Sequence, residues 1–138
     1  MKVHVPLLLS LAVALPSLAA QPFRAVNRLF VYPLSADTFE VIEDRGVGAR
    51  GIWCAAADYT KAAGLDGARK RMYILEPRGP SKTVQGRMGV VYTLNPDDAL
   101  RNTPTSYSVS VKRVGENLPV GHAYLFCEAF IEELFDRF

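Results

Sequence analysis

Histidine and cysteine are scarce in this chain of 138 residues, which contains two of each. His4 lies in an apolar N-terminal segment, so His122 is the one histidine of the remaining chain. A zinc site usually draws three or four ligands from histidine, cysteine and acidic residues, and no Cys-x-x-Cys pair occurs here. No Gly-x-Ser-x-Gly elbow presents a serine that His122 could activate. We therefore expect no metal, no cofactor and no Ser-His-Asp active site.

A strong excess of either charge is also missing. Removing Lys2, which belongs to the N-terminal segment, from the 16 basic residues leaves 15 against 14 acidic ones. A nucleic-acid-binding domain is usually strongly basic, so this balance argues against a nucleic-acid partner. The segment 68–87 is locally basic, which suits either a solvated surface or a patch for an anionic partner. The patch would comprise Arg69, Lys70, Arg71, Arg78 and Lys82.

The only long apolar run lies at the N-terminus, in MKVHVPLLLSLAVALPSLAA. Lys2 precedes an apolar stretch from Val5 to Leu15, and small residues follow Pro16. This order is typical of a secretory signal peptide, and the stretch is too short to span a bilayer comfortably. We expect residues 1–20 to be a signal peptide, residues 21–138 to form one exported domain, and the protein to reside in a bacterial periplasm.

The remaining chain alternates short strand patterns with two helical ones, which predicts an α+β fold. Residues 50–63 carry small apolar residues at helical spacing and end at Gly64, where a left-handed residue typically stops a helix. Before it, the glycine-rich segment 45–51 predicts a flexible connection. Strands are expected at 27–34, 38–43, 71–75, 88–94, 106–113 and 120–127, one helical turn at 97–101 and a short helix at 128–135. Such an order favours a mostly antiparallel sheet of five or six strands with the 50–63 helix packed on one face. A helix is the alternative for 120–127.

The two cysteines admit two interpretations. Trp53-Cys54 is similar to the pair that opens a thioredoxin active site, but position 57 is alanine and no resolving thiol follows. An exported chain with two distant cysteines more commonly forms one disulfide. A Cys54–Cys127 bond would stabilise the fold by roughly 4 kcal/mol in the chain-entropy model.

Four sequence blocks carry a resemblance. They are 49–59 (ARGIWCAAADY), 77–81 (PRGPS), 106–112 (SYSVSVK) and 118–127 (LPVGHAYLFC). The chain resembles small uncharacterised exported proteins of alphaproteobacteria in these blocks. The resemblance implies a periplasmic protein with a cysteine pair, and it implies no activity.

Three functions remain open on these observations. The first is a non-enzymatic, disulfide-stabilised module that binds another envelope protein, the envelope surface or a small ligand. The second is a thiol redox protein that uses Cys54, assisted by His122 or Cys127. The third is a small hydrolase with a carboxylate pair, for which the candidates on regular elements are Glu40, Glu43, Asp58 and Glu76.

Overall fold

The structure, a computed structural model, describes residues 1–12, 21–67, 70–106 and 108–137. Its strands are β1 (Phe23–Arg24), β2 (Phe30–Pro33), β3 (Thr38–Ile42), β4 (Arg71–Pro80), β5 (Met88–Thr93) and β6 (Asn117–Pro119). Its helices are α1 (Gly48–Ala62), α2 (Asp98–Arg101), α3 (Val120–Tyr124), the 3-10 turn η1 (Leu125–Cys127) and α4 (Glu128–Phe135).

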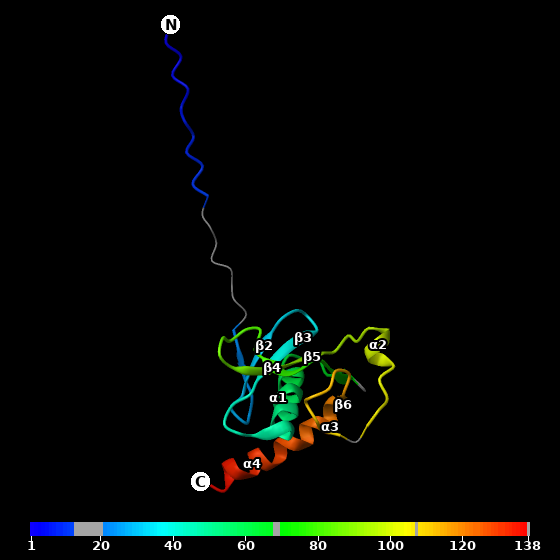
Figure 1. Ribbon diagram of the computed structural model, residues 1–138. Helices are drawn as coiled ribbons and strands as arrows, with labels where there is room; N and C mark the ends of the chain where they lie inside the picture. Colours follow the sequence, from blue (N-terminus) through cyan, green and yellow to red (C-terminus); the bar gives the residue numbers. More distant parts are fainter. Residues whose placement is uncertain (13–20, 68–69, 107, 138) are drawn as a thin grey trace.

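The strands form one six-stranded sheet in the order β1-β2-β3-β5-β4-β6, and every neighbouring pair is antiparallel. Helix α1 lies across one face of this sheet (Figure 1). The α+β class, with a mostly antiparallel sheet, a helix on one face and a short C-terminal helix, is confirmed.

The core lies between α1 and the sheet. Phe39 and Val41 of β3 are fully buried there, because alternate residues of a strand share a face. Small residues of α1 let the helix approach the sheet closely, and its one tryptophan, Trp53, lies edge-on to Tyr92 of β5 with ring centroids 4.9 Å apart. Burial of apolar surface is the main favourable contribution to folding, and these large aromatic side chains supply part of it.

Helix α1 ends where the sequence predicts and begins earlier. Gly64 has a φ of 70°, and the amides of Gly64 and Leu65 bond back to the carbonyls of Lys61 and Thr60. This is the Schellman arrangement that a glycine after the last turn favours. The prediction of a flexible connection over 45–51 is wrong in its second half, since residues 48–51 form the first turn of α1.

Two strand predictions are wrong. The described residues of 106–113 form no strand, because serine side chains bond the main-chain amides that a neighbouring strand would otherwise bond. The segment 120–127 is helical, as α3 and η1, whereas a strand was expected up to Cys127. The sequence predicts that the strand from Arg71 ends before Pro77, but β4 extends to Pro80 and its pairing with β5 contains two register shifts.

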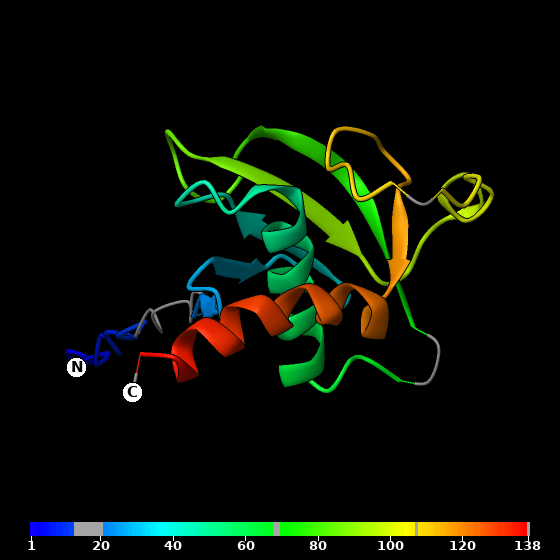
Figure 2. The same cartoon turned by 90° about the horizontal axis from the view of Figure 1, so that it is seen from below.

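The last three helical elements follow one another almost in line. Figure 2 shows α3, η1 and α4 running across α1 toward the C-terminus. Among the described residues, no helix is both long and apolar enough to cross a membrane. The signal-peptide prediction concerns residues 1–20, of which 1–12 form no helix or strand and 13–20 lie outside the described residues, so it stays a prediction.

Candidate functional site

A cleft of about 540 Å³ opens between the first turn of α1, the start of β4, β6, α3–η1, and the residues Thr105, Ser106 and Val109. Three basic side chains line it, namely Arg50, Arg71 and His122. The apolar side chains of Val109, Leu118 and Phe126 line it as well. No acidic residue is among its lining residues, which are completed by Thr105, Ser106 and Pro119. We refer to it as the basic cleft.

Arg71 is held in place by a chain of hydrogen bonds. Its Nε donates to Oδ1 of Asn117 over 2.8 Å, and Nδ2 of the buried Asn117 donates to the carbonyl of Gly115 over 2.9 Å. The β4–β6 pairing supports this contact, since it places Tyr73 opposite Asn117 and Arg71 opposite Pro119. An arginine fixed in this way loses less conformational entropy when it binds an anion.

Arg50 and His122 approach the cleft from two helices, α1 and α3, and both lie near the ring of Phe126. The guanidinium of Arg50 lies 5.7 Å from the ring centroid of Phe126, and the imidazole of His122 lies 6.3 Å from the same centroid. Both basic residues are exposed, so their polar groups are accessible to a ligand. Phe126 offers a flat apolar surface close to both of them.

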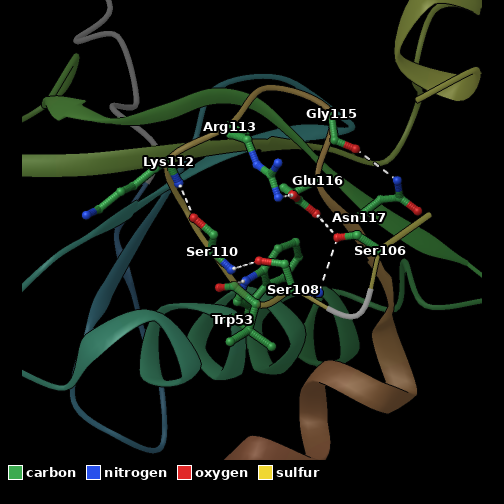
Figure 3. A network of polar contacts seen from close by, with 10 residues as sticks. Trp53, Ser106, Ser108, Ser110, Lys112, Arg113, Gly115, Glu116 and Asn117 are labelled. Atoms are coloured by element: carbon green, nitrogen blue, oxygen red, sulfur yellow. Dashed lines mark hydrogen bonds and ion pairs between the residues drawn. The ribbon is translucent and has the colours of Figure 1, made fainter. Parts of the chain in front are cut away.

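The wall of the cleft is a serine-rich segment that bonds to itself. The hydroxyls of Ser106, Ser108 and Ser110 each accept the amide two residues on, at 3.1 to 3.2 Å (Figure 3). Such serine turns satisfy main-chain groups without a neighbouring strand. The described residues of this segment belong to no strand, and a surface segment held by its own side chains suits a binding wall.

Two side chains anchor this wall to the domain. Nε1 of Trp53 donates to the carbonyl of Val109 over 2.8 Å, from the buried face of α1. Glu116, which is buried, accepts Ser106 Oγ over 2.8 Å and pairs with Arg113 over 2.5 Å (Figure 3). The cleft thus has a positioned arginine on one side and a wall fixed by two polar anchors on the other.

The predicted disulfide is present. Cys54 and Cys127 are bonded, with their Cα atoms 5.0 Å apart, and both residues are fully buried. The bond ties α1 to η1 and so fixes the helical side of the cleft. Thiol–disulfide exchange needs a thiolate to reach one of the sulfurs, and burial on both sides opposes such an approach.

The structure distributes the predicted anionic-partner patch over several places. Arg71 lies in the basic cleft, whereas Lys70 lines a different hollow with Lys61 and Asp66. At the other end of β4, Arg78 pairs with Glu43 at 2.5 Å and Lys82 pairs with Glu76 at 3.1 Å. Arg69 lies outside the described residues. A role of these residues toward an anionic partner stays a prediction.

The four candidate carboxylates serve separate structural contacts. Asp58 accepts the amide of Val26 at 2.8 Å, and Glu43 and Glu76 form the ion pairs just described. Glu40 is buried and accepts bonds from the turn at 81–83, through Ser81 Oγ, Lys82 N, Thr83 N and Thr83 Oγ1. Burial raises the pKa of this carboxyl, but the hydrogen bonds outweigh it, so the pKa lies below its ordinary value. None of the four lines the basic cleft.

In the part of the chain that the structure describes, no group of three or more His, Cys, Asp and Glu side chains is arranged to hold a metal ion. Comparisons of the chain with protein family models, with curated proteins and with solved structures gave no match. The resemblance to exported alphaproteobacterial proteins therefore stays a prediction, and the function must be argued from the cleft itself.

Sequence reasoning missed most of the basic cleft. The sequence places Arg71 in a basic segment, and nothing in its local pattern connects Arg50 or His122 with that segment. The block that contains His122 and the block that contains Arg50 each hold one cysteine. The predicted disulfide was therefore the one signal that could have placed these two basic residues near each other.

Proposed function

We propose that the protein is an exported, disulfide-stabilised binding module that holds a small organic anion, with a carboxylate as its head group, in the basic cleft. The observation that carries this proposal is the lining of the cleft: two arginines and a histidine beside an apolar floor, with no acidic side chain. Charge-assisted hydrogen bonds from arginine suit a carboxylate. The apolar floor suits the body of the same molecule.

Binding without reaction fits the groups present. The cleft contains donors and apolar surface. His122 is its one side chain that could act as a general base, no thiol lines it, and the Ser106 hydroxyl donates to Glu116. Export and a periplasmic location are part of the proposal. They are supported by the signal-like N-terminal segment and by a disulfide, which persists in oxidising compartments.

Trp53 provides a built-in reporter for a test. It is the only tryptophan, and its indole bonds the carbonyl of Val109 in the cleft wall. Titration with benzoate should change its fluorescence, and calorimetry should give the dissociation constant. Benzamidinium has a similar shape and the opposite charge, so it should not bind.

Matched variants locate the binding. Arg71→Gln should weaken benzoate binding by about tenfold, which corresponds to loss of about 1.4 kcal/mol, one charge-assisted contact. Arg101→Gln removes a positive charge from α2, outside the cleft, and should leave the dissociation constant unchanged. Equal binding of benzoate and benzamidinium, or equal weakening in both variants, would contradict the proposal.

A further inference from the structure

A second cavity, of about 290 Å³, lies between α4 and the two turns that precede β2 and α1. Its lining includes three arginines, Arg28, Arg45 and Arg137, and the apolar side chains of Val47, Phe130 and Leu134. We refer to it as the arginine pocket. It shares no lining residue with the basic cleft.

The charges in the arginine pocket are unbalanced. One acidic residue, Glu133, lines it together with the three arginines, and that residue pairs with Arg137 at 2.6 Å. Arg45 lies 3.9 Å from Asp44, which also pairs with Arg87 at 3.2 Å. Among the ion pairs of the described residues, Arg28 takes part in none. The lining therefore has an excess of two positive charges.

Two of these arginines occupy an unfavourable backbone conformation. Arg28 has a φ of 70° and Arg45 a φ of 58°, and they are the only non-glycine residues with positive φ in the described part of the chain. Glycine adopts this region without a steric cost, whereas a residue with a Cβ atom does not. Both residues are exposed, so their side chains gain little from burial in return. Arginine at both positions points to a use of the guanidinium groups themselves.

Helix α4 is incompletely packed on the same side. None of its residues is buried, and it contacts chiefly η1. Phe130 and Leu134, one turn apart, line the arginine pocket rather than a packed core. A ligand with an apolar portion would complete the burial of this face while its charged end met the arginines.

We infer that the arginine pocket binds a phosphate monoester that carries an apolar group. A phosphate monoester has a charge of about −1.5 to −2 at pH 7, which matches the excess of two positive charges, and arginine is well suited to its oxygens. The same chemistry is found in a soluble alkyl phosphate and in the headgroup of an anionic lipid, and the experiment separates these two sources.

The first test measures the binding of hexyl phosphate to the full exported chain. Inorganic phosphate, which lacks the apolar group, and hexanol, which lacks the phosphate, are measured for comparison. Hexyl phosphate should bind more tightly than either half by calorimetry, and it should slow amide hydrogen exchange in α4. Absence of binding, or binding without any added protection of α4, would overturn the inference.

The decisive variant is Arg28→Gly/Arg45→Gly. Glycine suits both backbone positions, so the thermal midpoint should stay the same or rise while the affinity for hexyl phosphate falls at least tenfold. Arg28→Asn/Arg45→Asn, which also tolerates positive φ, provides a second folded variant. Arg101→Ala is the charge control and should bind normally. Unchanged affinity in either double variant would exclude the arginine pocket.

Two further arms identify the source and separate the two sites. The protein is mixed with phosphatidylcholine vesicles that either contain or lack phosphatidic acid. If it sediments only with the vesicles that contain phosphatidic acid, the ligand is a lipid headgroup. If it binds hexyl phosphate but sediments with neither kind of vesicle, the ligand is a soluble phosphate.

Arg50→Gln/Arg71→Gln should abolish benzoate binding and leave hexyl phosphate binding intact. If this variant lost hexyl phosphate binding instead, the ligand would belong to the basic cleft and the inference would be wrong.

Discussion

Strand β5 and the described residues of 106–113 are both bonded to β4, but they are held by different groups. β5 is bonded by main-chain ladders to β3 on one side and β4 on the other. The described residues of 106–113 are joined to β4 by a main-chain bond from Arg78 N to the carbonyl of Val111. They are held further by their serines, by Trp53 and by Glu116. A ladder tolerates side-chain changes, whereas the cleft wall should respond to the loss of any single anchor.

The largest effect is expected from removing the disulfide. Cys54→Ala/Cys127→Ala should lower the free energy of unfolding by about 4 kcal/mol, because the bond closes a loop of 73 residues. Urea unfolding measures the loss. Hydrogen exchange should show α3, η1 and the 106–113 segment released before β5. A uniform increase of exchange over both regions would contradict the proposed difference.

The next effect concerns the indole anchor. Trp53→Phe should lower the free energy of unfolding by about 2–3 kcal/mol, since it leaves the Val109 carbonyl without its donor and reduces the buried volume. Exchange in 106–113 should increase more than exchange in β5.

Tyr92→Phe is the matched control for this change. Among the described residues, the Tyr92 hydroxyl is the one buried side-chain nitrogen or oxygen atom without a hydrogen-bond partner. Its removal should leave stability unchanged or raise it by about 1 kcal/mol. A larger loss for Tyr92→Phe than for Trp53→Phe would contradict the anchoring role of the indole N–H, because the buried Tyr92 hydroxyl has no hydrogen-bond partner to lose.

Within the sheet, the side chain of Glu40 also acts as an anchor, and its contribution to the free energy of unfolding should depend on pH. Glu40→Gln should cost about 2 kcal/mol at pH 7, because the carboxylate accepts bonds from the 81–83 turn. The folded-state pKa is lowered from 4.5, so this contribution is complete above that pH and is lost as the pH falls through the lowered value.

Urea unfolding of wild type and Glu40→Gln from pH 7 to pH 3 measures this dependence. The difference between the two proteins should shrink only below about pH 4.5. A difference that is constant down to pH 3 would mean that the charge of Glu40 does not contribute.

The smallest effect is expected from the serine turns. Ser108→Ala/Ser110→Ala should cost about 1 kcal/mol in total, because each hydroxyl bonds a half-exposed or exposed amide. Benzoate binding should weaken as the wall loosens. Ser81→Thr, which keeps the hydroxyl at the 81–83 turn, should leave benzoate binding unaffected. Equal weakening in both would show that the wall does not depend on its serines.

The elements that the sequence predicts well are those whose signal is local. The helical spacing of Ile52, Ala55 and Ala56 and the stop at Gly64 are sufficient for α1. Alternation indicates β3, and a run of strand-forming residues indicates β5. The disulfide could be predicted because the chain has only two cysteines.

The misassigned segments show where local patterns are ambiguous. Serine at every second position predicts a half-buried strand, but the same spacing places each hydroxyl next to the amide two residues on. Strand β6, at Asn117–Pro119, is too short for periodicity to detect. The basic cleft depends on the β4–β6 pairing and on the disulfide, which bring Arg50, Arg71 and His122 together from distant parts of the chain.

The fixed carboxylate of Glu40 also couples two positions on neighbouring strands. A Cβ atom at Gly89, which lies on β5, would come within 2.8 Å of Cδ and Oε2 of Glu40. The carboxylate cannot move aside without giving up its bonds to the 81–83 turn. We therefore expect positions 40 and 89 to covary among related chains: a residue larger than glycine at 89 should occur only where position 40 has lost its long acidic side chain.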